Sequence, residues 1–500
     1  MDISLNIREN EAYVRSQCEG CADIHIRPMK LGRDRQLVCF VVYIETAVSN
    51  MMLRDSLVGQ MINRLWEMPQ REILKCIREN SLGISDVKEL ATMEEAMAAM
   101  LAGNAVMFLD RYDRAVKIAS KGYPSRGVPK AEFEKALRGS SEGFTESEKV
   151  NAALIRKRIR STDLKVEEMI VGKRSQTMLA LVYMDGLAYE SLLDDIREKL
   201  KNFEVDGVFD TGMVEQLAEE RWMSPFPQFE TTERPDRAAM EILNGRVALL
   251  CDNAPNALIL PTTFSSFMQA GEDRYNRFEI VTFQRFIRYA AVILAMMFSG
   301  VYLAVINFHT QILPTHLLLS FAEARQGVPF PSILEVLFME LAFELIREAG
   351  VRMPGPLGGT IGIVGGLIIG DAAVGANLVS PMAVVVVALS ALSSFAIPDE
   401  EFSAPFRLLK YGFILLGGWF GIFGIVCGCY LVLGHLAGLT SFRIPYLMPF
   451  IGSGLKGYEK DRDGIFRGPL VRMRRRPVFA RRGERIRLRM GDDAREQRGE

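Results

Sequence analysis

The chain changes character near residue 270. Before that point, charged stretches with helical periodicity alternate with short apolar runs rich in Val, Leu and Tyr. Beyond it, residues 289–322 contain no Asp, Glu, Lys or Arg, and residues 372–397 contain none either. Because a membrane-spanning helix needs about 20 apolar residues, the sequence predicts a helical membrane domain in the second half and excludes a purely soluble protein.

Two blocks of the first half recur in the same order. Residues 101–110 align without gaps with residues 243–252 at a spacing of 142, and residues 40–47 align with residues 180–187 at a spacing of 140. Recurrence in order and at nearly constant spacing indicates an internal duplication. Strand-like runs alternate with helical stretches in each copy, which predicts an α/β fold for both.

We therefore expect residues 30–125 and 165–262 to fold alike, with 101–118 superposing on 243–260. The predicted architecture is a soluble α/β region of two similar subdomains followed by an all-α polytopic membrane domain. The four parts are an α/β subdomain with a connecting helix, a second α/β subdomain, the helical transmembrane domain and a disordered basic cytoplasmic tail, at residues 1–160, 161–270, 271–452 and 453–500.

The apolar segments of the membrane domain differ in length and charge. Residues 289–313 form a first predicted span, and residues 411–433, introduced by Lys410, form another. Residues 333–346 are apolar but carry three glutamates, so one face must avoid lipid. Residues 357–370 are too short to cross upright. Asp371 separates that segment from the apolar run 372–397.

Basic flanks set the expected orientation. Residues 456–489 contain 13 Lys or Arg against four Asp or Glu, and Arg285 and Arg288 precede the first span. Short basic flanks stay cytoplasmic, so both termini are expected there, with an even number of crossings. The net charge of the whole chain is −1, which argues against nucleic acid; an arginine-rich segment after the last membrane stretch indicates contact with anionic lipid instead.

Four glycines recur every fourth residue in one apolar segment: Gly358, Gly362, Gly366 and Gly370. Such a stripe lets another helix approach to backbone contact. It fits helix packing within one subunit, and it also fits a surface facing a pore or a second subunit. Leucine at Gly362 or Gly366 is expected to be more damaging than leucine at Gly417 or Gly418, which lie outside this stripe.

Three carboxylates lie within the apolar half: Glu340, Glu344 and Asp371. At that depth a carboxylate needs a partner or water. Glu340 and Glu344 share one helix face, either as the solvated side of an interfacial helix or as a cation-attracting vestibule in an oligomer. Asp371 is either a functional ionisable group or a turn residue at a helix break.

Motifs for chemistry are few. Cys18 and Cys21 have metal-ligand spacing, but one pair is half a site. No nucleotide-binding loop, nucleophile elbow or zinc-protease motif occurs in the sequence, which argues against a primary pump. We expect no catalytic residue, no metal, no cofactor and no enzymatic activity.

Several runs together resemble the GerA family, the A subunits of spore germination receptors. The resemblance covers about residues 20–450 and is carried by GVPFPSILE, MELAFELIREAGVRMP, IVGGLIIG, RGSSEGFTE, NAALIRKRI, TERPD and SFAIP, at residues 327–335, 339–354, 363–370, 138–146, 151–159, 232–236 and 394–398. Stage V sporulation protein AF is a close relative of the same build. The long arginine tail departs from the family pattern.

The resemblance implies a non-enzymatic, multi-pass protein of the spore inner membrane with a cytoplasmic region of two α/β subdomains. It implies assembly of A subunits into a ligand-gated ion channel that triggers germination, beside a B subunit that binds the nutrient and a lipoprotein C subunit. The alternatives are a secondary transporter, a scaffold whose α/β pair recruits other germination proteins, or an accessory membrane protein like the stage V relative.

Overall fold

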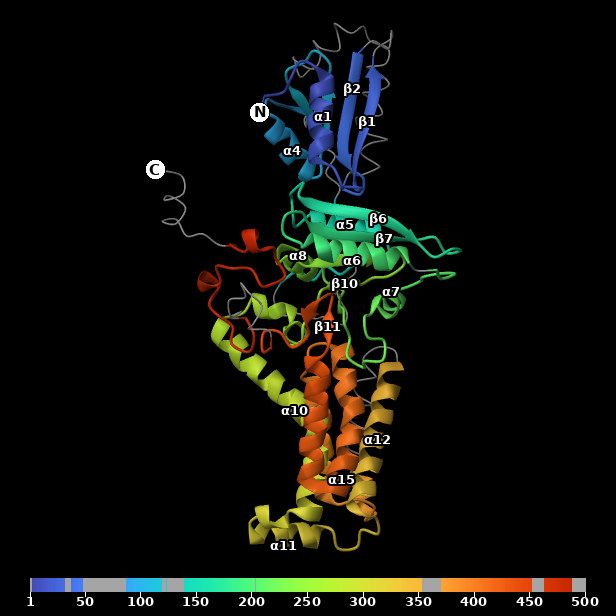
Figure 1. The fold of residues 1–500 in the computed structure, drawn as a ribbon, viewed down its shortest axis with the longest axis vertical. Helices are drawn as coiled ribbons and strands as arrows, with labels where there is room; N and C mark the ends of the chain where they lie inside the picture. The colour runs from blue at the N-terminus through green and yellow to red at the C-terminus, as the bar shows by residue number, and fades with distance from the viewer. Residues whose placement is uncertain are drawn as a thin grey trace. The chain divides into compact units, whose positions relative to one another are not determined.

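The computed structural model describes residues 2–31, 37–47, 87–118, 123, 139–202, 204–352, 370–451 and 463–487. The chain divides into two compact units (Figure 1). The α/β unit comprises Met1–Glu220, Gln228–Thr262 and Val471–Glu500, and the helical unit comprises Arg221–Pro227 and Thr263–Leu470.

The α/β unit contains two five-stranded sheets of the same topology. The first has the order β1-β2-β4-β5-β3 and the second the order β6-β7-β9-β10-β8, and neighbouring strands pair antiparallel. The strands are β1 Ile24–Leu31, β2 Leu37–Ile44, β3 Val87–Leu90, β4 Ala105–Leu109, β5 Ala115–Ile118, β6 Leu164–Val171, β7 Thr177–Met184, β8 Glu230–Thr232, β9 Val247–Cys251 and β10 Ala257–Leu260.

The matching strand order confirms the predicted duplication within the described residues. Strands β4 and β9 have equivalent bounds at the spacing of 142 seen in the sequence, and so do β5 and β10. The helices repeat as well. Copy 1 has α1 Ile7–Gln17 and α4 Met93–Leu101, and copy 2 has the equivalent α5 Glu148–Arg156 and α8 Pro235–Leu243. Copy 2 also contains α6 Glu190–Lys201 and α7 Thr211–Ala218, whose counterparts in copy 1 would fall outside the described residues.

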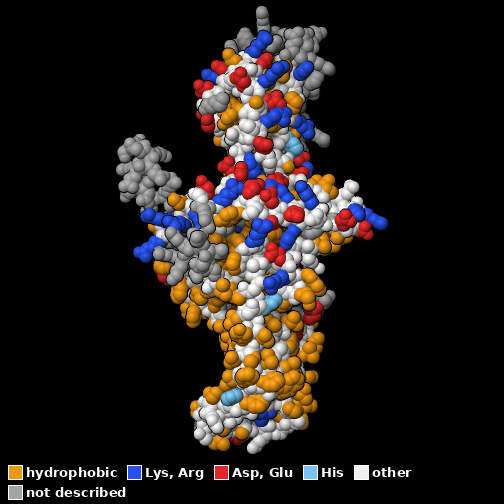
Figure 2. Space-filling view, in the orientation of Figure 1, with side chains coloured by type: hydrophobic (Ala, Val, Ile, Leu, Met, Phe, Trp, Pro, Cys, Tyr) orange, Lys and Arg blue, Asp and Glu red, His pale blue; other side chains and the backbone are white. Residues whose placement is uncertain are grey.

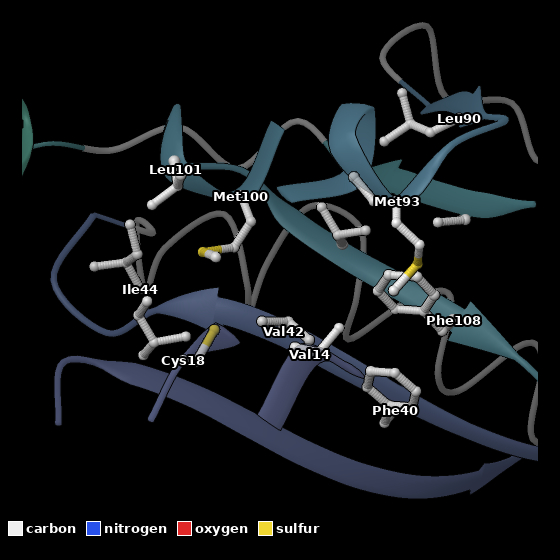
Figure 3. Close-up of a cluster of buried hydrophobic side chains, with 14 of the residues drawn as sticks. Val14, Cys18, Phe40, Val42, Ile44, Leu90, Met93, Met100, Leu101 and Phe108 are labelled. Atoms are coloured by element: carbon white, nitrogen blue, oxygen red, sulfur yellow. The ribbon is translucent and has the colours of Figure 1, made fainter. Parts of the chain in front are cut away.

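Each copy buries its own core between sheet and helices. In copy 1, Val14 and Met93 reach from the helices toward Phe40 and Phe108, whose rings stack with centroids 4.8 Å apart (Figure 3). Each such side chain contributes roughly 1.5–3 kcal/mol on full burial. Each copy is therefore stabilised by a hydrophobic core of its own.

Helix α5 differs from the predicted connecting helix. It is the counterpart of α1 and opens copy 2, because Ala152, Leu154 and Ile155 enter the core of that copy. Ala153 of the same helix packs in the core of copy 1. Helix α5 thus contributes to the cores of both copies.

The helical unit is built around two long apolar helices. Within the described residues, α10 Phe278–Phe308 and α15 Glu400–Ala437 are long and apolar enough to cross a membrane, and α14 Pro381–Phe395 is a shorter apolar helix. Hydrophobic side chains cover their outer surface, whereas charged side chains gather over the α/β unit (Figure 2). The other elements are α9 Phe264–Phe267, η2 Gly271–Arg274, η3 Thr310–Ile312, α11 Thr315–Ala324, α12 Ser332–Arg352, β11 Thr440–Ser441 and β12 Ile444–Pro445.

The apolar run 372–397 is not one helix. Residues 370–375 are helical, residues 376–380 form a turn, and α14 begins only at Pro381. Proline disfavours helical backbone in the residue before it, and the Ser380 side chain caps the new helix by accepting from the Ala383 N–H at 3.3 Å. The sequence analysis missed this break because the run is apolar throughout and contains no charged residue to mark it.

Glycines set the contact between α10 and α15. A Cβ added at Gly417 would lie 2.2 Å from the Gly300 carbonyl oxygen, and one added at Gly418 would lie 2.6 Å from Ile333. Gly417 and Gly418 therefore lie in close helix contacts of their own. That leucine is more damaging at Gly362 or Gly366 stays a prediction, because those two glycines lie outside the described residues. Gly421 bends α15 with a φ of 63°, and a Cβ there would lie 3.0 Å from His309 Cε1.

The described part of the basic tail contacts protein. In the helical unit, Asp463 accepts from Arg285 at 2.7 Å, and Arg467 donates to the carbonyls of Arg274 and Asn276 at 3.1 Å. Residues 471–487 belong to the α/β unit. The predicted disorder of the tail therefore does not extend to these contacts.

Candidate functional site in the helical unit

Helix α12 carries acidic side chains inside the helical unit. Glu335 and Glu340 are buried, with 2% and 0% of their surface exposed, and Glu344 is half-buried. Each carboxylate lies within 4 Å of a basic side chain, which is Arg325 for Glu335, Lys410 for Glu340 and Arg407 for Glu344. The acidic face of α12 is thus paired with cations of the same unit.

Glu340 occupies the most buried of these positions. One carboxylate oxygen accepts from the Ser299 hydroxyl at 2.6 Å and the other from the Lys410 ammonium at 2.5 Å. Ser299 comes from α10 and Lys410 from α15, so the cluster joins three helices. A buried ion pair repays the desolvation of both charges only with good geometry and further hydrogen bonds. The result is a neutral polar centre among apolar helices.

Glu335 closes the break before α14. Its carboxylate accepts from the Ser380 backbone N–H at 2.5 Å, and its other oxygen lies 3.9 Å from the Arg325 guanidinium. The first N–H groups of a helix carry partial positive charge, which a carboxylate stabilises. Glu335 therefore holds the N-terminus of α14 inside the protein.

A second polar layer surrounds Glu344. Arg407 lies 3.8 Å from Glu344 and donates to Glu400 at 2.9 Å. Arg347 donates to the Ser394 hydroxyl at 2.9 Å, and its guanidinium lies 4.2 Å from the centroid of the Phe395 ring. This layer is more exposed than the Glu340 cluster, so its ion pairs contribute less.

The predicted intramembrane carboxylates separate in the structure. Glu340 and Glu344 lie in different polar layers, and Asp371 is exposed on the helical turn 370–375. The glycine stripe is described only at Gly370, where a Cβ would lie an ordinary 3.4 Å from Val384. Its other members, Gly358, Gly362 and Gly366, lie outside the described residues.

The sequence interpretation missed the partners of Glu340. Lys410 was expected to flank a span beginning at residue 411, but α15 begins at Glu400 and buries Lys410 within the helix. Ser299 gave no signal, because an uncharged serine in an apolar helix predicts no ion pair. Lys410 at the edge of an apolar run was the available clue, because a buried carboxylate needs a cation.

The arginines before the first span are also paired. Arg285 and Arg288 lie in α10, are buried, and donate to the Asp273 carboxylate at 3.0 and 2.8 Å. The two arginines therefore hold the first turns of α10 in place through Asp273, in addition to making this end of the helix basic.

The Cys18–Cys21 pair has no metal-site geometry. Both thiols are free and buried, and Cys21 Sγ lies 3.4 Å from the Leu164 carbonyl oxygen. Burial raises the pKa of the Cys18 thiol to about 12, which disfavours the thiolate that binds metals. Within the described ranges, His, Cys, Asp and Glu side chains form no group of three or more suited to a metal.

Comparison with known proteins identifies the family. The model of the Bacillus/Clostridium GerA spore germination protein family matches residues 12–479. The chain is 38% identical over 485 residues to the uncharacterized membrane protein YfkQ of Bacillus subtilis (strain 168), covering 96% of this chain and 92% of that protein. It is 34% identical over 485 residues to spore germination protein KA of the same organism, covering 97% and 88%.

A solved structure is also similar. The crystal structure of the N-terminal domain of the A subunit of the Bacillus megaterium spore germinant receptor GerK3 is 28% identical, covers 53% of this chain and 98% of that chain, and gives a TM-score of 0.42. The family match over nearly the whole length accounts for both halves of the sequence. The chain is therefore a membrane protein that belongs to the GerA family of spore germination proteins.

Proposed function

We propose that this chain is the A subunit of a nutrient germinant receptor in the spore inner membrane, where its helical units assemble into a gated ion path. It is a non-enzymatic, multi-pass subunit with both termini cytoplasmic, and it works beside B and C subunits. The observation that supports the ion path is the buried Glu340–Lys410 pair at the meeting of three helices.

The pair has the properties of a gate that rests closed. Glu340 and Lys410 neutralise each other at 2.5 Å, and both are buried, so no net charge faces the helix interfaces. An ion passing between these helices requires water to enter and the pair to separate. The closed state buries both charges against each other, and the open state exposes both to water. Intermediate arrangements would leave a buried charge without a partner, so the pair favours two distinct states.

Ion flux through reconstituted protein tests this proposal. Glu340→Gln or Lys410→Gln leaves one buried charge without its partner, which costs about 3–5 kcal/mol, so both single variants should assemble poorly. The double variant removes both charges and should regain assembly. If the pair is the gate, the double variant should conduct without the nutrient signal, because separating two neutral amides exposes no charge.

The control is Glu344→Gln, which alters a half-buried carboxylate 3.8 Å from its partner. This variant should assemble and conduct as the unaltered chain does. A double variant that assembles normally and conducts only with the signal contradicts the gate and leaves the pair a structural contact. Cross-linking in native membranes tests assembly independently, and a solely monomeric chain contradicts the oligomeric path.

A secondary transporter is the second candidate, because two helices are interrupted within the described part of the helical unit. One break is the turn 376–380 before α14, and the other is the bend of α15 at Gly421. Discontinuous helices are typical of midplane substrate sites in transporters. Solute counterflow in vesicles distinguishes the two, because a transporter exchanges labelled for unlabelled solute across the membrane without net current, and a channel does not.

A further inference from the structure

The two copies of the α/β unit carry equivalent glycines at one turn. Gly103 and Gly245 lie 142 residues apart, follow α4 and α8, and both have a φ of 92°. Each is covered by other atoms so closely that a Cβ would clash. The chain segments that cover them, however, come from different places.

In copy 1 the cover is local. A Cβ at Gly103 would lie 2.7 Å from Tyr123, which follows β5 in the chain, and 3.4 Å from the Ala47 carbonyl oxygen. The Tyr123 hydroxyl also donates to the Leu101 carbonyl at 2.9 Å. A buried carbonyl needs such a donor. Tyr123 therefore packs over the turn and also satisfies the hydrogen-bonding capacity of the Leu101 carbonyl.

In copy 2 the chain after β10 enters the helical unit from Thr263, and the C-terminal segment supplies the cover. A Cβ at Gly245 would lie 2.6 Å from Ala480 Cα. Arg476 Nε donates to the Leu243 carbonyl at 2.8 Å, which is the counterpart of the Leu101 carbonyl. The Arg481 N–H donates at 2.8 Å to the carbonyl of Leu187, the counterpart of Ala47.

The docked segment is a hairpin with two buried side chains. Arg475 and Ile486 form an antiparallel bridge, and between them Phe479 is 6% exposed and Ala480 is 0% exposed. The Phe479 ring lies 4.1 Å below the Arg246 guanidinium. The segment lies against the end of α8, where Figure 1 draws it in red.

Arginine side chains complete the contact. Arg481 donates to the Ala188 carbonyl and, at 2.8 Å, to Glu190, and Arg485 donates to the Tyr189 hydroxyl at 3.2 Å. Across the whole contact, backbone carbonyls accept three of the five hydrogen bonds described here, so recognition depends on the position of each donor as well as on charge. The fit is strictest at Ala480, because its Cα rests on a glycine.

We propose that the turn at Gly245, together with residues 187–190, is a peptide-recognition site for a Phe-Ala-Arg segment, and that its occupant is residues 474–487 of the same chain. The site exists because duplication reproduced the turn of copy 1 without the Tyr123 that covers it. This role goes beyond the proposed receptor function. It also engages tail arginines that would otherwise be available to anionic lipid.

Limited trypsin digestion of the full chain in detergent tests the docking. The arginines of the docked hairpin should resist cleavage, and Gly245→Ala should accelerate their cleavage roughly tenfold or more, because the new Cβ displaces Ala480. The matched control is Gly186→Ala, since Gly186 also has a positive φ but no atom within 4 Å of its Cβ position. Equal cleavage in both variants overturns the proposal.

Binding in trans tests the specificity. In full-length Ala480→Leu the tail should leave the site, and a labelled peptide of residues 471–487 should then bind by fluorescence anisotropy. The same peptide should fail to bind the double variant Ala480→Leu, Gly245→Ala. A scrambled peptide of equal composition that binds equally well shows attraction by charge alone and overturns the site.

A vesicle experiment separates this site from a lipid contact. The unaltered full chain is reconstituted without detergent into vesicles of phosphatidylglycerol and phosphatidylcholine and is then digested. Continued protection of the hairpin supports docking on copy 2. If the vesicles release the tail to trypsin and bind it, the segment is a lipid-binding tail and the proposal is wrong. None of these readouts depends on ion flux, so they can fail without affecting the proposed gate.

Discussion

Two buried ion pairs, Arg156–Asp23 in the α/β unit and Lys410–Glu340 in the helical unit, are satisfied differently. In the α/β unit, Arg156 donates to both Asp23 oxygens and also to the carbonyls of Ser161 and Leu164, at 3.0 and 2.9 Å. In the helical unit, Lys410 has three donors, and the hydrogen bond found for it within the described residues goes to Glu340. Arg156 thus uses four of its five N–H donors, and we call this pair saturated; the bond to Glu340 uses one of the three donors of Lys410.

This difference separates a structural contact from a switchable one. Arg156 connects α5 to Asp23 just before β1, so it fixes copy 1 to copy 2. Opening that contact would leave several buried groups without partners at once. Opening the Glu340–Lys410 contact frees one ammonium and one carboxylate, which water can solvate. The comparison therefore predicts that the Arg156–Asp23 contact opens less readily than the Glu340–Lys410 contact.

The largest expected effect comes from breaking the saturated pair. Arg156→Ala leaves Asp23 buried without its partner, and such losses cost about 3–5 kcal/mol. Hydrogen exchange of the full chain should show β1 and β6 losing protection, with the helical unit unaffected. Arg15→Ala is the control, because Arg15 pairs with Glu11 at 2.7 Å on the surface and should cost less than about 1 kcal/mol.

Loss of protection in the helical unit as well would show that the two units are energetically coupled. Equal effects of Arg156→Ala and Arg15→Ala would remove the basis of the comparison. In either case the saturated hydrogen bonding of Arg156 would no longer explain why its contact with Asp23 opens less readily.

A smaller effect is expected in the helical unit, which is stabilised by backbone contact between helices. Gly417→Leu would force α15 away from Gly300, and overpacking of this kind costs about 1–3 kcal/mol. The thermal midpoint of unfolding in detergent should fall. Gly412→Leu is the matched control on the same helix, because no atom lies within 4 Å of its Cβ position. Similar midpoints for the two variants would show that α10 and α15 can separate freely.

The sequence predicted the α/β unit better than the helical unit for a physical reason. Because the subdomain is duplicated, the sequence contains two versions of the same fold, and a strand predicted in residues 101–118 could be checked against residues 243–260. In the helical unit, the contact at Gly417 depends on Gly300 in a helix distant in sequence. The hydrophobicity of a segment predicts neither the close contact between Gly417 and Gly300 nor the burial of Lys410.

The same limit explains the tail. Thirteen basic residues in residues 456–489 predict a solvated or lipid-bound segment. Docking at Gly245 depends instead on a turn that copy 2 shares with copy 1, and on Ala480, which is small enough to lie against that glycine. The composition of the tail shows that Arg476 and Arg481 are charged, but it cannot predict that backbone carbonyls accept their hydrogen bonds.

The smallest expected effect is on the pH dependence of the α/β unit. Burial, together with repulsion from Asp252 and Glu168, raises the pKa of Glu148 from 4.5 to about 7. The folded state therefore holds a proton that the unfolded state releases at lower pH. Stability from this group is complete below pH about 4.5 and is lost as the pH rises through about 7.

Hydrogen exchange of α5 and β6 between pH 5 and 8, corrected for the intrinsic rate, measures this loss, which should be about 1–2 kcal/mol. Glu148→Gln should remove that part of the pH dependence. Glu142→Gln is the control of opposite sign: burial acts against it, but hydrogen bonds from Lys157 and Arg158 lower the pKa of Glu142, so its contribution is lost only when the pH falls into the acid range. A Glu148→Gln variant that keeps the full slope between pH 5 and 8 would show that another group titrates between the copies.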